Sequence, residues 1–187
     1  MQSKHSKIKD LAIIALFAAI MCILGPLSIP IGPVPISLTT FAVFLSVYLL
    51  GAKKSAISVI IYLLIGLTGI PVFSGFQGGV AKLAGPTGGY LLGFIPAAII
   101  AGLLISRFAQ KKMASIISMI LATCILYLIG TAWLAVSLHL TPWQALSAGV
   151  LPFIPGDIIK IICAVFAGQL LLKRTPINEY LNSSVTR

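Results

Sequence analysis

Six long apolar runs occupy most of this sequence, and short clusters of lysine and arginine separate several of them. A helix that crosses a bilayer needs about 20 apolar residues. Only 9% of the residues are charged, against about 25% in soluble domains. This pattern excludes a soluble globular protein, a disordered chain and a coiled coil. We predict an all-α integral membrane protein, a single domain over residues 1–187 with six transmembrane helices. The predicted helices cover residues 11–24, 38–52, 55–70, 90–108, 113–138 and 156–172.

The net charge of +10 comes from cations that are distributed unevenly between the loops. With six spans, eleven of the thirteen cations fall on one side, the opposite loops carry only Lys82, and Lys160 lies inside the last helix. Loops rich in lysine and arginine stay in the cytoplasm, so both termini are predicted to be cytoplasmic. Short separate clusters do not predict a nucleic-acid surface, which needs basic residues on one folded face. The eleven are Lys4, Lys7, Lys9, Lys53, Lys54, Arg107, Lys111, Lys112, Lys173, Arg174 and Arg187.

Two segments rich in glycine and proline, residues 25–37 and 71–90, connect helices on the predicted outer side. The three helices next to them have only 14 to 16 apolar residues, which is short for a crossing. Irregular backbone at membrane depth has to be buried in protein or to face a water-filled cavity. We therefore expect both segments to be re-entrant or lid-like walls of an outward-facing cavity. The alternative is that they are plain surface loops.

Asp157 and Lys160 are the most informative charged pair, because both lie near the outer end of the last predicted helix. Their i, i+3 spacing puts them on one helix face. A lone charge at the bilayer centre costs about 3 kcal/mol, so charges in spanning helices usually mark a function. We expect this pair to bind a small polar group. The alternative is an ion pair that only neutralises itself near the interface.

The glycine-rich segment supplies the remaining candidate ligand contacts. Gly78 and Gly79 allow backbone to approach a ligand closely. Lys82 is either a ligand contact or an exposed loop lysine. Neutral hydrogen bonds are expected from three further side chains, those of Gln77, Thr87 and Tyr90. The segment lacks the order of a phosphate-binding loop, so any uphill transport would be driven by a partner or by an ion gradient.

Catalytic and metal chemistry find no support in the sequence. Asp10, Asp157 and Glu179 are the only acids, and two of them lie at the predicted cytoplasmic ends, so no pair of carboxylates can share a proton as in an aspartyl protease. His5 and His139 are isolated, without the spacing of a zinc protease. We expect no enzyme activity, no metal site and no cofactor.

Ala15 and Ala19 form a small-residue pair one turn apart on the first predicted helix. Such pairs let membrane helices approach closely. The pattern leaves open whether the partner is another protein or another helix of this chain.

Three stretches together resemble the BioY family, the biotin-specific substrate-binding (S) components of energy-coupling-factor (ECF) transporters. They are PIGPVPISLTTF (30–41), GIPVFSGFQGGVAKLAGPTGGYLLGF (69–94) and LPFIPGDIIK (151–160). The resemblance covers nearly the whole chain. It implies a six-helix membrane fold that binds biotin from outside, with a transmembrane T component and two cytoplasmic ATPases as partners. It also implies that Ala15 and Ala19 dock on the T component and that Asp157 and Lys160 contact biotin. Thr39, a further candidate contact, stands where many members carry glutamine.

The chemistry of biotin agrees with these residues. Asp157 suits the two ureido N–H donors, and Lys160 or Lys82 suits the ureido oxygen or the valerate carboxylate. We therefore predict a high-affinity biotin-binding S component of the bacterial cytoplasmic membrane. A stand-alone vitamin permease that works without ATPase partners is the alternative. A structural subunit with no ligand would leave Asp157 and Lys160 unexplained.

Overall fold

Helices make up most of the structure. It is a computed structural model that describes residues 2–108 and 111–174, with side chains from Lys7 onward. Lys4 and Arg187, two of the cations in the charge pattern, lie outside the described side chains. The helices are α1 (Gln2–Leu24), α2 (Thr39–Leu67), α3 (Val80–Ala84), α4 (Gly88–Arg107), α5 (Lys112–Leu138), α6 (Pro142–Gly149) and α7 (Ile154–Arg174). Two short strands, β1 (Ser28–Ile29) and β2 (Ile36–Ser37), pair antiparallel within residues 25–37.

Helix α2 is interrupted by Gly51, whose φ of 73° and ψ of −174° are non-helical. The two halves fold back on each other, which brings Ser46 Oγ and Ser55 Oγ to 2.7 Å from one another. Nine residues of continuous helix would separate them by about 13.5 Å. The sequence predicts two helices here with the turn at residues 53–54. In the structure the turn is at Gly51, since only glycine adopts this backbone conformation readily.

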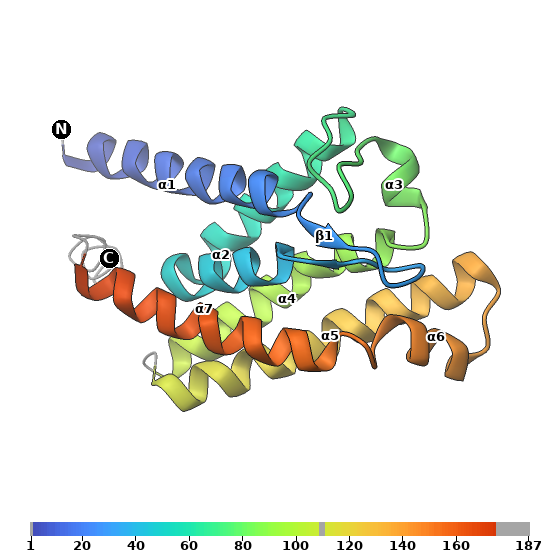
Figure 1. Cartoon of the computed structure of the whole chain (residues 1–187). Coiled ribbons are helices and arrows are strands. Elements are labelled where there is room, and N and C mark those ends of the chain that lie inside the picture. The colour runs from blue at the N-terminus through green and yellow to red at the C-terminus, as the bar shows by residue number, and fades with distance from the viewer. Residues whose placement is uncertain (1, 109–110, 175–187) are drawn as a thin grey trace.

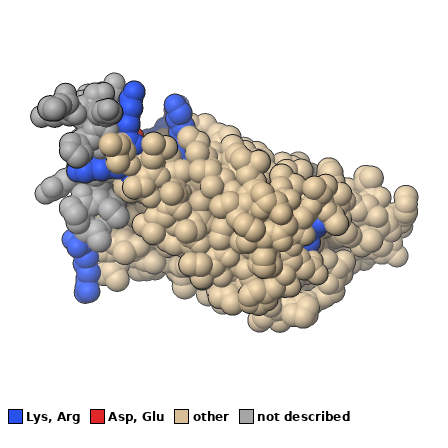
Figure 2. Space-filling model, turned by 90° about the horizontal axis from the view of Figure 1, so that it is seen from above, with Lys and Arg blue, Asp and Glu red and all other residues tan. Residues whose placement is uncertain are grey.

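The long helices run between two ends of the molecule, and different elements lie at each end (Figure 1). The start of α1 and the end of α7 lie at one end, and the β1–β2 hairpin, α3 and α6 lie at the other. Figure 2 shows most lysine and arginine side chains gathered at the end where α1 begins. Among the described residues, four helices are long and apolar enough to span a membrane: α2, α4, α5 and α7.

Small residues bring the central helices close together. Helix α4 packs against both α2 and α5. A Cβ atom added at Gly102 of α4 would lie 2.4 Å from the backbone of Ala52, so the helices approach too closely for any side chain at that position. Close contact at small residues is how helices associate where lipid replaces water.

Besides α2, three elements differ from the sequence-based expectation. Helix α1 begins at Gln2 rather than at residue 11, because no glycine or proline interrupts residues 2–24. The short helices α3 and α6 were not predicted. Helix α6 carries a sequence signal that identifies it, a capping box in which Thr141 and Gln144 exchange hydrogen bonds around Pro142 at the helix start.

Aromatic packing fixes the segment between α2 and α3. The ring of Phe73 packs edge-on against Tyr62 of α2 with 5.4 Å between ring centroids. The Tyr62 hydroxyl donates to the carbonyl of Val72 at 3.2 Å. These contacts fasten residues 71–77 to the helices, and Ser74 of this segment lines the cavity described next.

Candidate functional site

A narrow cavity of about 50 Å³ lies between α2, α4, α5, α7 and the two segments rich in glycine and proline. Both segments contribute residues to its wall. The cavity is lined by Val34, Pro35, Ser37, Thr39, Thr40, Ser74, Thr87, Tyr90, Leu91, Phe94, Leu126, Tyr127, Phe153, Asp157 and Lys160.

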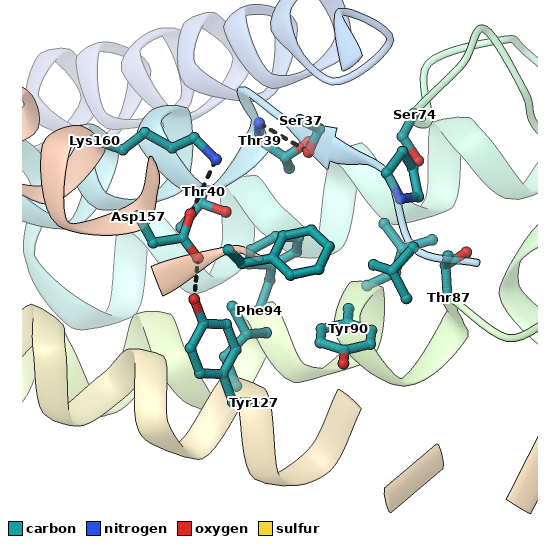
Figure 3. A pocket seen from close by; sticks show the side chains of 15 residues that line it. Ser37, Thr39, Thr40, Ser74, Thr87, Tyr90, Phe94, Tyr127, Asp157 and Lys160 are labelled. Atoms are coloured by element: carbon teal, nitrogen blue, oxygen red, sulfur yellow. Dashed lines mark hydrogen bonds and ion pairs between the residues drawn. The ribbon is translucent and has the colours of Figure 1, made fainter. Parts of the chain in front are cut away.

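Asp157 and Lys160 meet at one end of this cavity (Figure 3). Lys160 Nζ donates to Asp157 Oδ1 at 2.9 Å, and their side chains are only 11% and 5% exposed. Asp157 lies in the first turn of α7, where the positive end of the helix dipole stabilises a carboxylate. Pro155 is the second residue of the same helix, where proline is tolerated because it lies in the first turn. The sequence thus places a buried, paired charge at the point where α7 starts.

Tyr127 of α5 is the third member of this polar cluster. Its hydroxyl donates to Asp157 Oδ2 at 2.6 Å, so each carboxylate oxygen of Asp157 already accepts one hydrogen bond. Lys160 keeps further N–H donors, and each oxygen keeps acceptor capacity. The cluster therefore offers a neutral ligand group both donors and acceptors. The charges of Asp157 and Lys160 cancel, so the cluster carries no net charge.

The opposite end of the cavity is formed by Ser74 and Thr87, both from the segment 71–90 (Figure 3). Ser37 and Thr39 line the side formed by the hairpin and the start of α2, where the Ser37 hydroxyl donates to Thr39 Oγ1 at 2.9 Å. The walls between the two ends are mainly apolar and include Phe94 and Phe153. This arrangement suits an elongated ligand with an apolar body and polar groups at its ends.

Tyr90 lines the cavity, but its hydroxyl is engaged elsewhere. It donates to the carbonyl of Gly149 at 2.8 Å and lies 3.1 Å from Thr131 Oγ1. The hydroxyl proton of Tyr90 is therefore used within the protein, and a ligand contact of Tyr90 stays a prediction. Its hydroxyl joins α4 to α5 and α6, and its ring forms part of the wall.

Five of the predicted site residues, Thr39, Thr87, Tyr90, Asp157 and Lys160, line this one cavity. Gln77, Gly78 and Lys82 do not line it. They line an adjacent hollow, which shares Thr87 with the cavity.

Gly78 and Gly79 have structural roles of their own. A Cβ atom at Gly78 would lie 2.3 Å from the carbonyl oxygen of Ile70. Gly79 has a φ of 86° and donates its N–H to the carbonyl of Gly66 at 2.7 Å. Both glycines are thus explained by the path of the backbone, and Gly79 lines neither the cavity nor the hollow.

Sequence reasoning missed Tyr127, which no charge or glycine pattern marks. A hydroxyl in the middle of the apolar run 113–138 is the signal that was available. The site also includes Phe94, Thr40 and Ser74, which no sequence motif set apart from ordinary core or loop residues.

Ala15 and Ala19 lie on the exposed face of α1. Ile14, Phe17 and Ala18 of the same helix are buried against the rest of the protein. The described part of the chain therefore leaves this small-residue pair exposed. Its face is open to lipid or to a partner.

Among the described residues, no group of three metal-ligating side chains comes together.

The sequence model of the BioY family matches residues 1–176. The chain belongs to the BioY family. A protein of Pyrococcus horikoshii named probable biotin transporter BioY is 40% identical over 90% of this chain and 99% of its own length. Biotin transporter BioY2 of Lactococcus lactis subsp. cremoris is 38% identical over 91% and 93%.

A solved structure agrees with this BioY assignment. The S component for biotin from an ECF-type ABC transporter superposes with a TM-score of 0.86 at 33% identity, over 94% of this chain and 97% of the other. The resemblance seen in the sequence is confirmed. BioY proteins are transport proteins, and this member is not an enzyme.

Proposed function

We propose that this chain is a biotin-binding S component of an ECF-type importer. The observation that carries the proposal is the cluster of buried Asp157 with partly buried Lys160 and Tyr127 at one end of a largely apolar cavity. A ligand with a polar head and an apolar body fits such a site. The names of the relatives and of the superposed structure indicate biotin as that ligand.

The functional groups of biotin complement the cluster and the walls. The ureido ring has two N–H donors and one carbonyl acceptor. Asp157 accepts from the ring N–H groups, and Lys160 donates to the ureido oxygen. The aromatic rings of Phe94 and Phe153 cover the thioether-bearing bicycle. Biotin is the transported ligand of this protein and not a cofactor.

The charge distribution supports a membrane orientation. The end of the molecule where α1 begins and α7 ends carries most of the lysine and arginine (Figure 2), and such ends face the cytoplasm. In our proposal α1, the two halves of α2, α4, α5 and α7 make six crossings of a bacterial cytoplasmic membrane. Both termini are then cytoplasmic, and the two glycine-rich segments close the cavity from outside.

Energy for uptake comes from partners in this proposal. The exposed Ala15–Ala19 face of α1 docks on a transmembrane T component, because small residues permit close helix contact. Two cytoplasmic ATPases complete the importer.

Mass spectrometry of the purified chain tests the ligand. The protein is expressed in cells supplied with biotin and isolated in detergent, and its bound small molecules are extracted. Co-purified biotin in near-equal amount supports the proposal, and its absence together with another bound vitamin contradicts it. Uptake by vesicles that contain the chain without any ATPase would instead favour a stand-alone permease.

A further inference from the structure

A second hollow adjoins the cavity at Thr87, which lines both spaces. The hollow is open, has a volume of about 510 Å³ and is lined by Pro33, Gln77, Gly78, Ala81, Lys82, Gly85, Pro86 and Thr87. The hairpin loop is also common to the two, since Pro33 lines the hollow and the next two residues, Val34 and Pro35, line the cavity. The two spaces are therefore neighbours that share a wall.

The Thr87 hydroxyl has no hydrogen-bond partner among the described residues, although Thr87 is only 6% exposed. A buried hydroxyl without a partner costs free energy. Because Thr87 lies at the end of the cavity opposite Asp157 (Figure 3), a ligand group placed there would satisfy it. This end of the cavity thus has an unused hydrogen-bonding group.

Lys82 supplies a positive charge on the other side of Thr87. Of the acids in the described part of the chain, Asp10 pairs with Lys54 and Asp157 pairs with Lys160, so neither compensates Lys82. The Lys82 side chain is half-buried, and this burial lowers its pKa because desolvation disfavours the ammonium form. A bound anion would oppose this shift, because it stabilises the ammonium form.

We propose that the hollow around Lys82 and Thr87 is the subsite for the ligand's carboxylate. This inference rests on the proposed function, in which the ligand is biotin. The Asp157–Lys160 end is compensated in charge and suits the neutral ureido ring, whereas Lys82 is uncompensated and suits an anion. The valerate chain runs past Thr87, whose hydroxyl donates to a carboxylate oxygen. The two lysines thereby receive different roles, which the sequence alone leaves open.

Isothermal titration calorimetry with biotin and with its neutral primary amide tests the subsite. The two ligands share the ring system and differ in the charge of the terminal group. The Lys82→Gln variant should lose roughly 10- to 100-fold in affinity for biotin, the range for one charge-assisted hydrogen bond, and change little toward the amide. Lys82→Arg should retain most of the preference for biotin. Lys53→Gln, which removes an exposed cation from the turn within α2, is the matched control and should bind both ligands as the wild type does.

A Thr87→Val variant gives a second, independent readout with nearly unchanged side-chain shape. It should weaken biotin more than the amide, since bonds to a charged acceptor are stronger. The subsite would be overturned if Lys82→Gln and Thr87→Val each lost as much affinity for the amide as for biotin. It would also be overturned if neither variant lost affinity for biotin. If the wild type binds neither ligand, the proposed function itself fails. Wild-type binding with no preference for biotin over the amide contradicts the subsite alone.

Discussion

Each carboxylate oxygen of Asp157 has its own donor, and the two donors come from different helices. Lys160 lies on α7 with Asp157, whereas Tyr127 lies on α5. A carboxylate held from two sides has a fixed orientation, and fixed polar groups bind a ligand with less loss of conformational entropy. Tyr127 is thus a positioning residue for the proposed ligand contact.

Replacing Tyr127 by phenylalanine should weaken biotin binding by about 1.5–3 kcal/mol, the usual contribution of a hydrogen bond to a charged group. Titration calorimetry of the purified variant measures this directly. Ser118→Ala is the control, because it removes a buried hydroxyl from the same helix that donates to the carbonyl of Ala114 and does not line the cavity. Unchanged affinity in Tyr127→Phe would show that Lys160 alone orients the carboxylate.

The residues that sequence reasoning found are those whose burial is costly or whose chemistry is rare in a membrane. Asp157 and Lys160 were found because a charge inside an apolar run requires a reason. Tyr127 was missed because tyrosine in such a run is common, and its partner is thirty residues away. The internal hydrogen bond of the Tyr90 hydroxyl was missed for the same reason, since Gly149, its acceptor, is fifty-nine residues away.

Among the elements, α2 depends most on a single residue. The turn between its halves uses a backbone conformation at Gly51 that is essentially restricted to glycine. No neighbouring atom lies within 4 Å of a Cβ built at this position. A substitution there consequently tests backbone strain without a steric clash.

Gly51→Ala should destabilise the folded protein by about 1–3 kcal/mol, the cost of a side chain in this backbone region. Thermal unfolding in detergent measures the effect. Gly156→Ala is a matched control, because Gly156 is helical, its φ is not positive, and its Cβ would also meet open space. Equal transition temperatures for Gly51→Ala and wild type would mean that the turn forms differently.

The open face of α1 is the element most directly linked to the partner proposal. Ala15→Trp and Ala19→Trp should abolish co-purification with the T component and ATP-driven uptake, because a bulky side chain prevents close helix contact. Biotin binding by the isolated chain should persist, since neither alanine lines the cavity.

Leu103→Trp, on the exposed face of α4, serves as the control for a large side chain placed in lipid. Pull-down assays and uptake measurements on the three variants decide the matter. Loss of uptake in Leu103→Trp as well would indicate a general effect on insertion, and full uptake in both alanine variants would place the T component on another face.

The apolar runs predicted the long helices well, but they predicted the boundaries of some helices less well. The ends of α4, α5 and α7 fall within two residues of the expected positions. The turn in α2 was displaced because the paired lysines 53 and 54 suggest a loop, whereas the conformation of Gly51 decides it. The short helices α3 and α6 lie in segments whose glycine and proline content obscured the helical signal.

The asymmetry of charge along the whole molecule makes the orientation testable. Single cysteines at Lys9, Gln77 and Arg174, all exposed, are introduced after alanine replaces the three native cysteines. An impermeant maleimide applied to intact cells should label Gln77→Cys, and it should label Lys9→Cys and Arg174→Cys only after the membrane is permeabilised. Labelling of the latter two from opposite sides would exclude an even number of crossings.

The central claim is that this single chain binds biotin through the buried pair on α7. Titration calorimetry of the purified protein without partners tests it most directly. We expect one biotin per chain, and a loss of about 2–5 kcal/mol in binding free energy for Asp157→Asn and Lys160→Met, because each leaves a buried charge unpaired. Asp10→Asn, which breaks the other described ion pair with Lys54, should bind as the wild type does. No binding by the wild type, or undiminished binding by both α7 variants, would contradict the account.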